Sequence, residues 1–206
     1  MVTHSDTLSS SRGRGRPREF NMDEALDKAV RVFCERGYHA TSIADLTSAM
    51  ELASGSIYKA FKDKRAVFLA AFDHYKAVRD AQLREAIQRG VNGRERLRNA
   101  LDFFAASSYG VQGQLGCLVV SGAAELATFD EEISQRVTGA LEKSEIMLGE
   151  LLRQGQDDGS IPGTFDNQTM ARLMLCVLQG MRVIGKSGRS KQDMQAVADA
   201  AMKLLD

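Results

Sequence analysis

A short segment between residues 54 and 62 carries the side chains with the clearest chemistry in this sequence. One helical face, at positions i, i+3, i+4 and i+7, would be formed by Gly55, Tyr58, Lys59 and Lys62. This face has two ammonium groups, one phenolic hydroxyl and no carboxylate, and Ser54 and Ser56 add hydroxyls in the first turn. Hydroxyl and ammonium groups bind phosphate oxygens, and the first turn of a helix in the major groove lies near the base edges. The pattern therefore predicts a helix that binds DNA.

Such a helix must be held by other elements, and the flanking sequence supplies them. Apolar positions are spaced to give two short helices with one shared core, from Ile43, Leu46, Met50, Leu52, Ile57 and Phe61. A further helix is expected from about residue 21 to residue 37. Thr41 or Ser42 is expected to cap the helix that follows, and a hydroxyl there can also reach a phosphate. We therefore predict a three-helix helix-turn-helix DNA-binding domain at residues 21–65.

The same segment carries a family resemblance. The DNA-binding signature of TetR-type bacterial repressors is similar to the run Gly55, Ser56, Ile57, Tyr58, Phe61 and Lys64. Two positions depart from that signature. Glu51 stands in the inter-helix turn where the family usually has glycine, and a non-glycine residue in left-handed geometry costs about 1 kcal/mol. Ala53 stands where a serine or threonine usually caps the helix, so Ser54 is expected to take over the cap.

The resemblance implies a role for each residue of the predicted interface. Residues expected nearest the bases are Ser54, Gly55 and Ser56, and phosphate contacts are expected from Thr41, Ser42, Tyr58, Lys59 and Lys64. Lys64 lies in the first turn of the next helix, where a cation is unfavourable to the helix dipole, so its partner should lie outside that helix. An ordinary solvated lysine is the alternative. Thr41 has the simpler alternative role of a cap.

Residues 1–20 read as a flexible arm rich in arginine and glycine. Arg14 and Arg16 alternate with Gly15 and Pro17, a pattern that resembles an AT-hook. In such a segment arginines lie in the narrow minor groove of A·T-rich DNA. A solvated basic tail is the alternative interpretation.

Composition points to an all-α protein without a disulfide framework or a zinc site. The chain has 206 residues, 44% of them hydrophobic, with two prolines, no tryptophan and a formal charge of zero, so any charge that binds DNA must be local. Cys34, Cys117 and Cys176 are far apart and odd in number, which argues against a disulfide framework or a zinc site. No catalytic motif, metal-ligand spacing, cofactor motif or apolar run of about 18 residues is present. We expect a cytoplasmic protein that is not an enzyme and has no cofactor, metal or membrane partner.

Residues 66–206 are expected to form a larger helical effector-binding and dimerisation domain. The penultimate helix, at about 167–185, is apolar on two adjoining faces, and the last helix, at about 191–205, carries a further apolar stripe. A surface helix needs one apolar stripe to join its own core, so the second stripe suggests a partner. The two helices predict a homodimer through a four-helix bundle, as the resemblance also implies. Burial of both stripes in the chain's own core is the alternative.

An unknown small-molecule effector is expected in this second domain. Its pocket would be lined by Phe103, Phe104, Tyr109, Cys117, Phe129, Met147 and Met174. Each of these residues could equally be ordinary core. Cys117 follows Gly116 at an expected helix start, and a helix N-terminus lowers the pKa of a thiol. A role for Cys117 as an oxidation or electrophile sensor is therefore an alternative to simple packing.

These observations predict a DNA-binding transcriptional regulator, most simply a ligand-responsive repressor that binds a palindromic operator as a dimer. Two other classes stay open. One is a helical small-molecule-binding or cysteine-dependent protein whose basic front is incidental. The other is an architectural, A·T-preferring DNA binder led by the arginine arm.

Overall fold

The computed structural model describes residues 21–206, and this part of the chain is built from helices without a strand. The all-α prediction is therefore confirmed. The helices are α1 Met22–Arg36, α2 Ile43–Met50, α3 Ser54–Ala60, α4 Lys64–Gln88, α5 Gly93–Ala106, α6 Gly110–Leu115, α7 Leu118–Glu125, α8 Glu131–Asp157, α9 Asn167–Ile184 and α10 Lys191–Lys203. A 3-10 turn at Gly185–Ser187 links the last two. The predicted arm with Arg14 and Arg16 lies outside the described residues.

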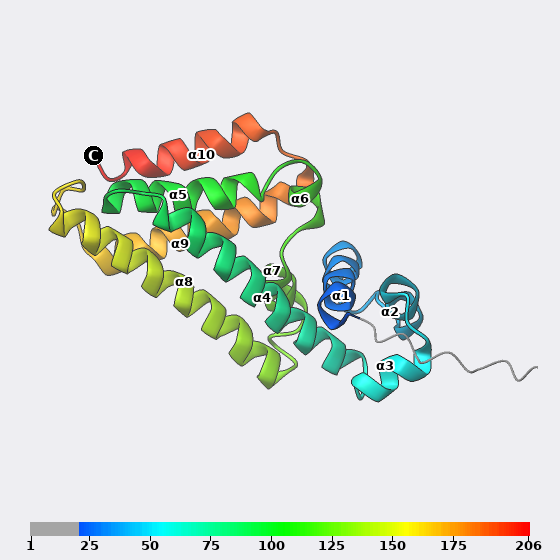
Figure 1. Cartoon of the computed structure of the whole chain (residues 1–206). Helices are drawn as coiled ribbons and strands as arrows, with labels where there is room; N and C mark the ends of the chain where they lie inside the picture. The colour runs from blue at the N-terminus through cyan, green and yellow to red at the C-terminus, as the bar shows by residue number, and fades with distance from the viewer. Residues whose placement is uncertain (1–20) are drawn as a thin grey trace, which may run out of the picture.

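The helices form two parts that α4 joins (Figure 1). At one end α1, α2 and α3 form a small unit, which we call the head. At the other end α5, α8, α9 and α10 pack together, with α5 against the second half of α4, and we call this the body. Between the two parts, the short helices α6 and α7 lie beside α1 (Figure 1). No helix in the described range 21–206 is long and apolar enough to cross a membrane.

Two hydrophobic cores run through the molecule, and the first extends beyond the head. It surrounds Phe33, Phe68 and Phe72 and also includes Leu118 of α7 and Ile133 of α8. The second core fills the body, where α5, α8, α9 and α10 contribute most of the buried side chains. The expected domain boundary at residues 65 and 66 falls in the first turn of α4, so the packing crosses it. The head is therefore supported by α7 and α8 as well as by α4.

The apolar stripe of the last helix is covered within its own chain. The apolar side chains of α10 are buried, with Met194, Ala198 and Ala201 each at most 3% exposed, and α10 packs on α5 of its own chain. Its apolar stripe is therefore already covered. For the α10 stripe, the alternative of burial in the chain's own core is the one that the structure shows. The homodimer predicted through α9 and α10 stays a prediction, because a single chain does not test it.

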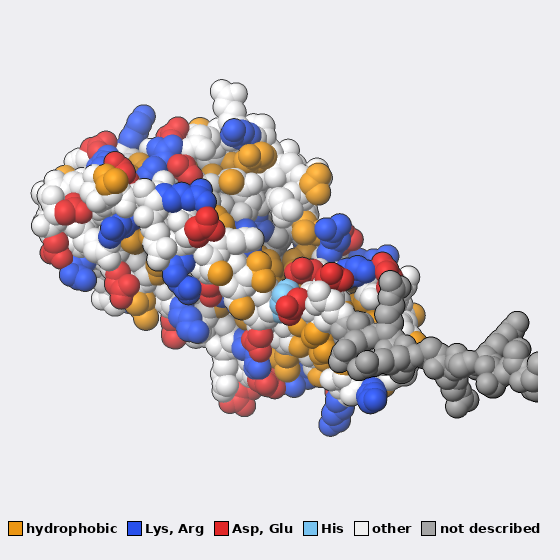
Figure 2. Space-filling model, viewed as in Figure 1, with side chains coloured by type: hydrophobic (Ala, Val, Ile, Leu, Met, Phe, Trp, Pro, Cys, Tyr) orange, Lys and Arg blue, Asp and Glu red, His pale blue; other side chains and the backbone are white. Residues whose placement is uncertain are grey.

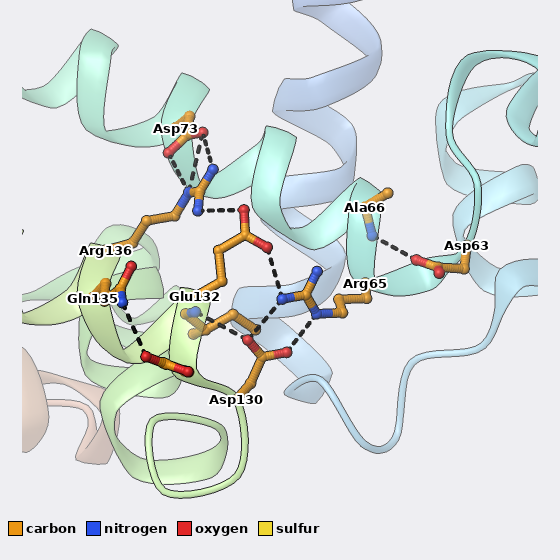
Figure 3. Close-up of polar contacts among 10 residues, drawn as sticks. Asp63, Arg65, Ala66, Asp73, Asp130, Glu132, Gln135 and Arg136 are labelled. Atoms are coloured by element: carbon orange, nitrogen blue, oxygen red, sulfur yellow. Dashed lines mark hydrogen bonds and ion pairs between the residues drawn. The ribbon is translucent and has the colours of Figure 1, made fainter.

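A chain of ion pairs ties the start of α4 to the start of α8 (Figure 3). Arg65 donates from Nη2 to Asp130 and to Glu132, at 2.8 Å in each case. Arg136 donates to the other oxygen of Glu132 at 2.8 Å and to Asp73 at 3.0 Å. Asp130 also accepts the backbone N–H of Ile133 and thereby caps α8. Hydrogen bonds from Arg65 are the main reason that the pKa of Asp130 falls to about 2.

The Asp130 contact predicts a specific acid sensitivity. Because the folded-state pKa lies below the ordinary value near 3.9, this contact stabilises the fold above pH ~4 and is lost as the pH falls through about 2. We expect Asp130→Asn, which keeps a capping oxygen, to lower the free energy of unfolding at pH 7 by about 1 kcal/mol. The deficit should shrink towards pH 2.5. Urea unfolding at several pH values measures this difference.

Asp157→Asn, which breaks an exposed pair with Arg153, is the control and should have little effect. A deficit in Asp130→Asn that stays constant with pH would contradict the account.

Candidate nucleic-acid interface

The outer face of α3 is exposed, and its inner face is anchored. Ile57 is fully buried and Phe61 is 9% exposed, so these two side chains fix the helix on the head. Tyr58 is 57% exposed, and Ser54, Gly55 and Lys59 are also exposed, while Ser56 is half-buried. A side chain at Gly55 would meet no atom of the chain within 4 Å, so packing does not demand glycine there. The predicted face thus lies on the surface as one set.

The turn between α2 and α3 keeps the left-handed geometry that the family resemblance implies. Glu51 has φ 56° and ψ 35°, and it is the only non-glycine residue with positive φ in the described part of the chain. Its carboxylate accepts a hydrogen bond from Nζ of Lys28 at 2.7 Å. Ala53 precedes the first residue of α3 and provides no side-chain cap. The expectation that Ser54 caps the helix is therefore wrong, because Ser54 is already the first helical residue.

Ser42, rather than Thr41, caps α2. Ser42 and Asp45 form a reciprocal capping box, in which each side chain accepts the backbone N–H of the other. Thr41 is 1% exposed, and its hydroxyl donates to the carbonyl of Gly37 at 2.6 Å. The proposed phosphate contact from Thr41 is therefore wrong for this geometry. Ser42 is exposed beside α2 and stays a candidate.

Lys64 has its partner inside the protein. Its Nζ donates to the carbonyls of Tyr38 at 3.0 Å and Thr41 at 2.9 Å, and it lies 4.3 Å from the centre of the Tyr38 ring. These carbonyls lie outside the lysine's own helix, as we expected from the helix dipole. They belong to the turn between α1 and α2, however, so the expected phosphate contact is not met in this geometry. Lys64 instead positions the head on α4.

A carboxylate holds the same turn from the opposite side. Glu125, the last residue of α7, accepts the backbone N–H of Tyr38 at 2.9 Å. Gly37 has φ 77°, and a Cβ on it would lie 2.7 Å from the Glu125 carboxylate, so both backbone geometry and space favour glycine there. The turn thus has an ammonium group on its carbonyls and a carboxylate on its amides. Sequence reasoning missed Glu125 because the contact joins residues that are 87 positions apart.

The predicted effector residues do not form a single site. Phe103, Phe104 and Cys117 line one cavity of about 40 Å³, and Met147 lines an adjoining cleft. Phe129 lies outside both of these spaces and is 84% exposed at the turn before α8. Met174 is fully buried in the body core, and Tyr109 packs against that core. For these two residues ordinary packing is the role that the structure gives.

Sequence reasoning also missed polar residues of this cavity, among them Tyr75, Arg79, Gln179 and Arg182. Arg182 was a usable signal, because it interrupts an otherwise apolar helix and is only 4% exposed. The position of Arg79 had no such signal, since the polar residues of α4 alternate around the whole helix.

Cys117 lies at the N-terminus of α7, as expected, and its surroundings favour the thiolate. Burial raises the thiol pKa, but Arg182, the hydroxyl of Tyr75 and the amides at the start of α7 together hold the pKa below its usual value. The Tyr75 hydroxyl lies 3.4 Å from Sγ. In Cys34, by contrast, burial raises the pKa to about 12, which makes that thiol unreactive. Within residues 21–206 no cluster of three or more histidine, cysteine or acidic side chains could hold a metal.

Charge is mixed over most of the visible surface (Figure 2). Acidic and basic side chains alternate over the body, while lysine or arginine side chains project at the end of the molecule where α3 lies (Figures 1 and 2). The positive charge is therefore local, as a neutral total requires of a DNA-binding protein.

Comparisons with known proteins agree with this geometry. Residues 25–71 match the family model for bacterial regulatory proteins of the tetR family, and residues 93–201 match a tetracyclin repressor-like C-terminal domain. The HTH-type transcriptional repressor ComR of Escherichia coli is 30% identical, over 99% of this chain and 97% of its own length. The HTH-type transcriptional repressor DhaR of a Mycobacterium species is 27% identical, over 87% of this chain and 89% of its own.

A solved structure extends the agreement to a complex with DNA. The TetR family transcriptional regulator CifR, as a cysteine mutant bound to a 26-base-pair operator, superposes with a TM-score of 0.83. It is 30% identical and is matched over 93% of this chain and all of that one. With its fold, its exposed α3 and these relatives, this chain belongs to the TetR family of bacterial regulatory proteins and is a DNA-binding transcriptional regulator.

Proposed function

We propose that this regulator is a repressor that binds a palindromic operator as a homodimer and leaves it when a small molecule enters the body. The observation that carries the proposal is the outer face of α3, where an exposed tyrosine and lysine flank a glycine with open space beside it. The relative CifR, which is bound to operator DNA in its structure, supports it. Because the partner is chromosomal DNA, we propose that the protein acts in the cytoplasm.

The interface divides into base-facing and phosphate-facing residues. Ser54, Gly55 and Ser56 would lie nearest the base edges in the major groove. Tyr58, Lys59 and the exposed Ser42 would contact phosphates and fix the register of the head on the duplex. Arg14 and Arg16 would extend the contact into the adjacent minor groove, in the way that basic arms of other DNA-binding domains do.

For the dimer we propose α8 and α9 in place of α9 and α10. On α9 an exposed stripe at helical spacing remains after the chain's own core is formed, made of Leu173, Cys176, Val183 and Ile184. Half-buried Gly180 lies on the same stripe, with open space beside it. Ile146 of α8 is 61% exposed, and its neighbour Glu145 pairs with Arg172 of α9. A second copy that packs two such helices against these two would form a four-helix bundle.

Release of DNA would follow from a difference in effector affinity between two arrangements of the dimer. In one arrangement the two heads match the half-site spacing of about 34–36 Å, and in the other they do not. To reverse a 99:1 preference, the effector must bind the second arrangement tighter by about 5.5 kcal/mol. The cavity at Phe103, Phe104 and Cys117 lies against α4, the helix that also carries the head.

The DNA-binding role predicts specific losses in two variants. We expect the purified protein to prefer its own upstream intergenic DNA over an unrelated fragment by ~10³ or more, in fluorescence anisotropy at several salt concentrations. Lys59→Ala should weaken binding to both fragments and reduce the salt slope by about 2 for a dimer, because one phosphate contact is lost per head. Tyr58→Ala should also weaken operator binding.

Lys203→Ala, at the exposed end of α10, is the control. Wild-type affinity in both α3 variants would show that α3 does not bind DNA.

The dimer proposal predicts different effects from two matched substitutions. Leu173 is 43% exposed on α9, and Leu204 is 52% exposed just after α10. Leu173→Arg should give a monomer in sedimentation velocity, because it places an unpaired charge in an apolar interface. Leu204→Arg should stay dimeric. A dimeric Leu173→Arg would show that the α9 stripe is not the interface, whereas a monomeric Leu204→Arg would favour an interface that includes α10.

A further inference from the structure

The cavity between α4, α5, α7, α8 and α9 contains one buried and one half-buried cation, and neither has an acidic partner. Arg182 of α9 is 4% exposed, and Arg79 of α4 lines the same space. Within residues 21–206, Arg182 donates to the carbonyl of Gly116 and Arg79 to the hydroxyl of Ser107, and neither forms an ion pair with a carboxylate. Asp80 also lines the cavity but pairs with Lys76 at 2.7 Å. The charge of the cavity is therefore positive.

The two arginines influence each other. Burial lowers the pKa of the Arg79 guanidinium, and the positive charge of Arg182 lowers it further. Like charges that share a buried site repel, and an anion placed between them removes that repulsion. The thiolate of Cys117 is one group within the chain that would do so in part, and an anionic ligand is another.

Hydrogen-bonding capacity in the same place is unused. The Nη1 atom of Arg182 is buried and has no hydrogen-bond partner among the described residues, and the same holds for Oε1 of Gln179. A buried donor without a partner is costly, and on a guanidinium it is costlier still. An acceptor-only group such as a carboxylate satisfies Arg182, and the amide of Gln179 can turn its NH₂ group towards the same anion.

Apolar side chains form much of the remaining wall of the cavity, which adjoins a larger cleft. Phe103 and Phe104 lie 5.9 Å apart at an angle of 75°, with Arg79 over the ring of Phe103 at 4.2 Å. The inner space of about 40 Å³ holds a head group but not a whole ligand. It adjoins a cleft of about 510 Å³, with which it shares Leu83 and the Lys76–Asp80 pair. Apolar side chains of that cleft include Ile87, Met147 and Leu151.

We propose that this cavity binds the carboxylate of a small organic acid, held by Arg182 and Arg79, with the apolar part of the acid extending past Phe103 and Phe104 into the cleft. The proposal deepens the ligand-responsive function proposed above and rests on it, because it names the chemical class of the effector. It also gives a route to the head. Arg182 holds the carbonyl of Gly116 just before α7, and Glu125 at the other end of α7 holds the turn between α1 and α2.

Isothermal titration calorimetry of the full-length protein without DNA tests the proposal independently of any operator. The probes are phenylacetate and hexanoate, each compared with its neutral amide. We expect saturable binding of at least one acid at pH 7.5 and at least ~10-fold weaker binding of its amide, because the amide lacks the charge that the guanidinium groups recognise. In Arg182→Gln and Arg79→Gln the acid should bind at least ~10-fold more weakly.

Two controls separate the cavity from general charge effects. Arg153→Gln removes an exposed guanidinium on α8 and should bind the acid like the wild type. Cys117→Ser should keep acid binding, whereas loss of binding there would show that the arginines serve the thiol. Absence of binding by both acids, equal binding of acid and amide, or wild-type affinity in both arginine variants would overturn the proposal. Circular dichroism establishes that each variant is folded. If Arg182→Gln does not fold, the result for Arg79→Gln decides the test.

If an acid binds, its effect on DNA is measured separately. If the acid binds but operator affinity is unchanged, the binding site is supported and its link to the regulatory function is contradicted. An acid that weakens operator binding in the wild type, but not in Arg182→Gln, would support both.

Discussion

The turn between α1 and α2 is the constraint on which the DNA-binding geometry depends. Its carbonyls at Tyr38 and Thr41 accept from the Lys64 ammonium, and its amide at Tyr38 donates to the Glu125 carboxylate. Backbone groups of a half-buried turn need such partners, and charged partners give the stronger hydrogen bonds. Lys64 begins α4 and Glu125 ends α7, so these two contacts fix the head against two different helices. Ile57 and Phe61 fix α3 on the head, and the turn fixes the head on α4 and α7, so the turn helps to set the direction of the exposed face of α3.

The same arrangement connects the head to the interior of the body. The helix α7 has eight residues and reaches from Cys117 beside the cavity to the turn of the head. A rigid short helix transmits a displacement at one end to the other, since packed cores are not continuously deformable. The Arg65 network adds a second tie between α4 and α8. These contacts connect the head physically to the helices α4, α7 and α8 around the cavity, as the proposed release of DNA requires.

Local signals in the sequence predicted most of the helices and the exposed face of α3, because helical periodicity depends only on near neighbours. They missed α6, whose glycines indicate a break rather than a helix. Predictions were wrong where a residue is engaged by a part of the chain that is distant in the sequence. Lys64 and Thr41 have the types that suit a phosphate, but both are engaged by the turn of the head. The stripe of α10 is covered by α5, and Phe129 is exposed at a corner that spacing alone cannot locate. Arg182 could have been recognised as a charge within an apolar helix, whereas Glu125 and Arg79 become significant only in three dimensions.

The most direct test of whether the held turn sets the DNA-binding geometry is the affinity of Glu125→Ala for the upstream intergenic DNA. The affinity is measured well below the melting temperature of the variant protein. Loss of the carboxylate leaves the Tyr38 amide without its partner, so we expect operator binding to weaken by about 5-fold or more while the fold persists. Glu125→Gln keeps an accepting oxygen and should recover part of the affinity, and Glu142→Ala, an exposed glutamate of α8, should have no effect. Operator affinity in Glu125→Ala equal to that of the wild type would contradict the account.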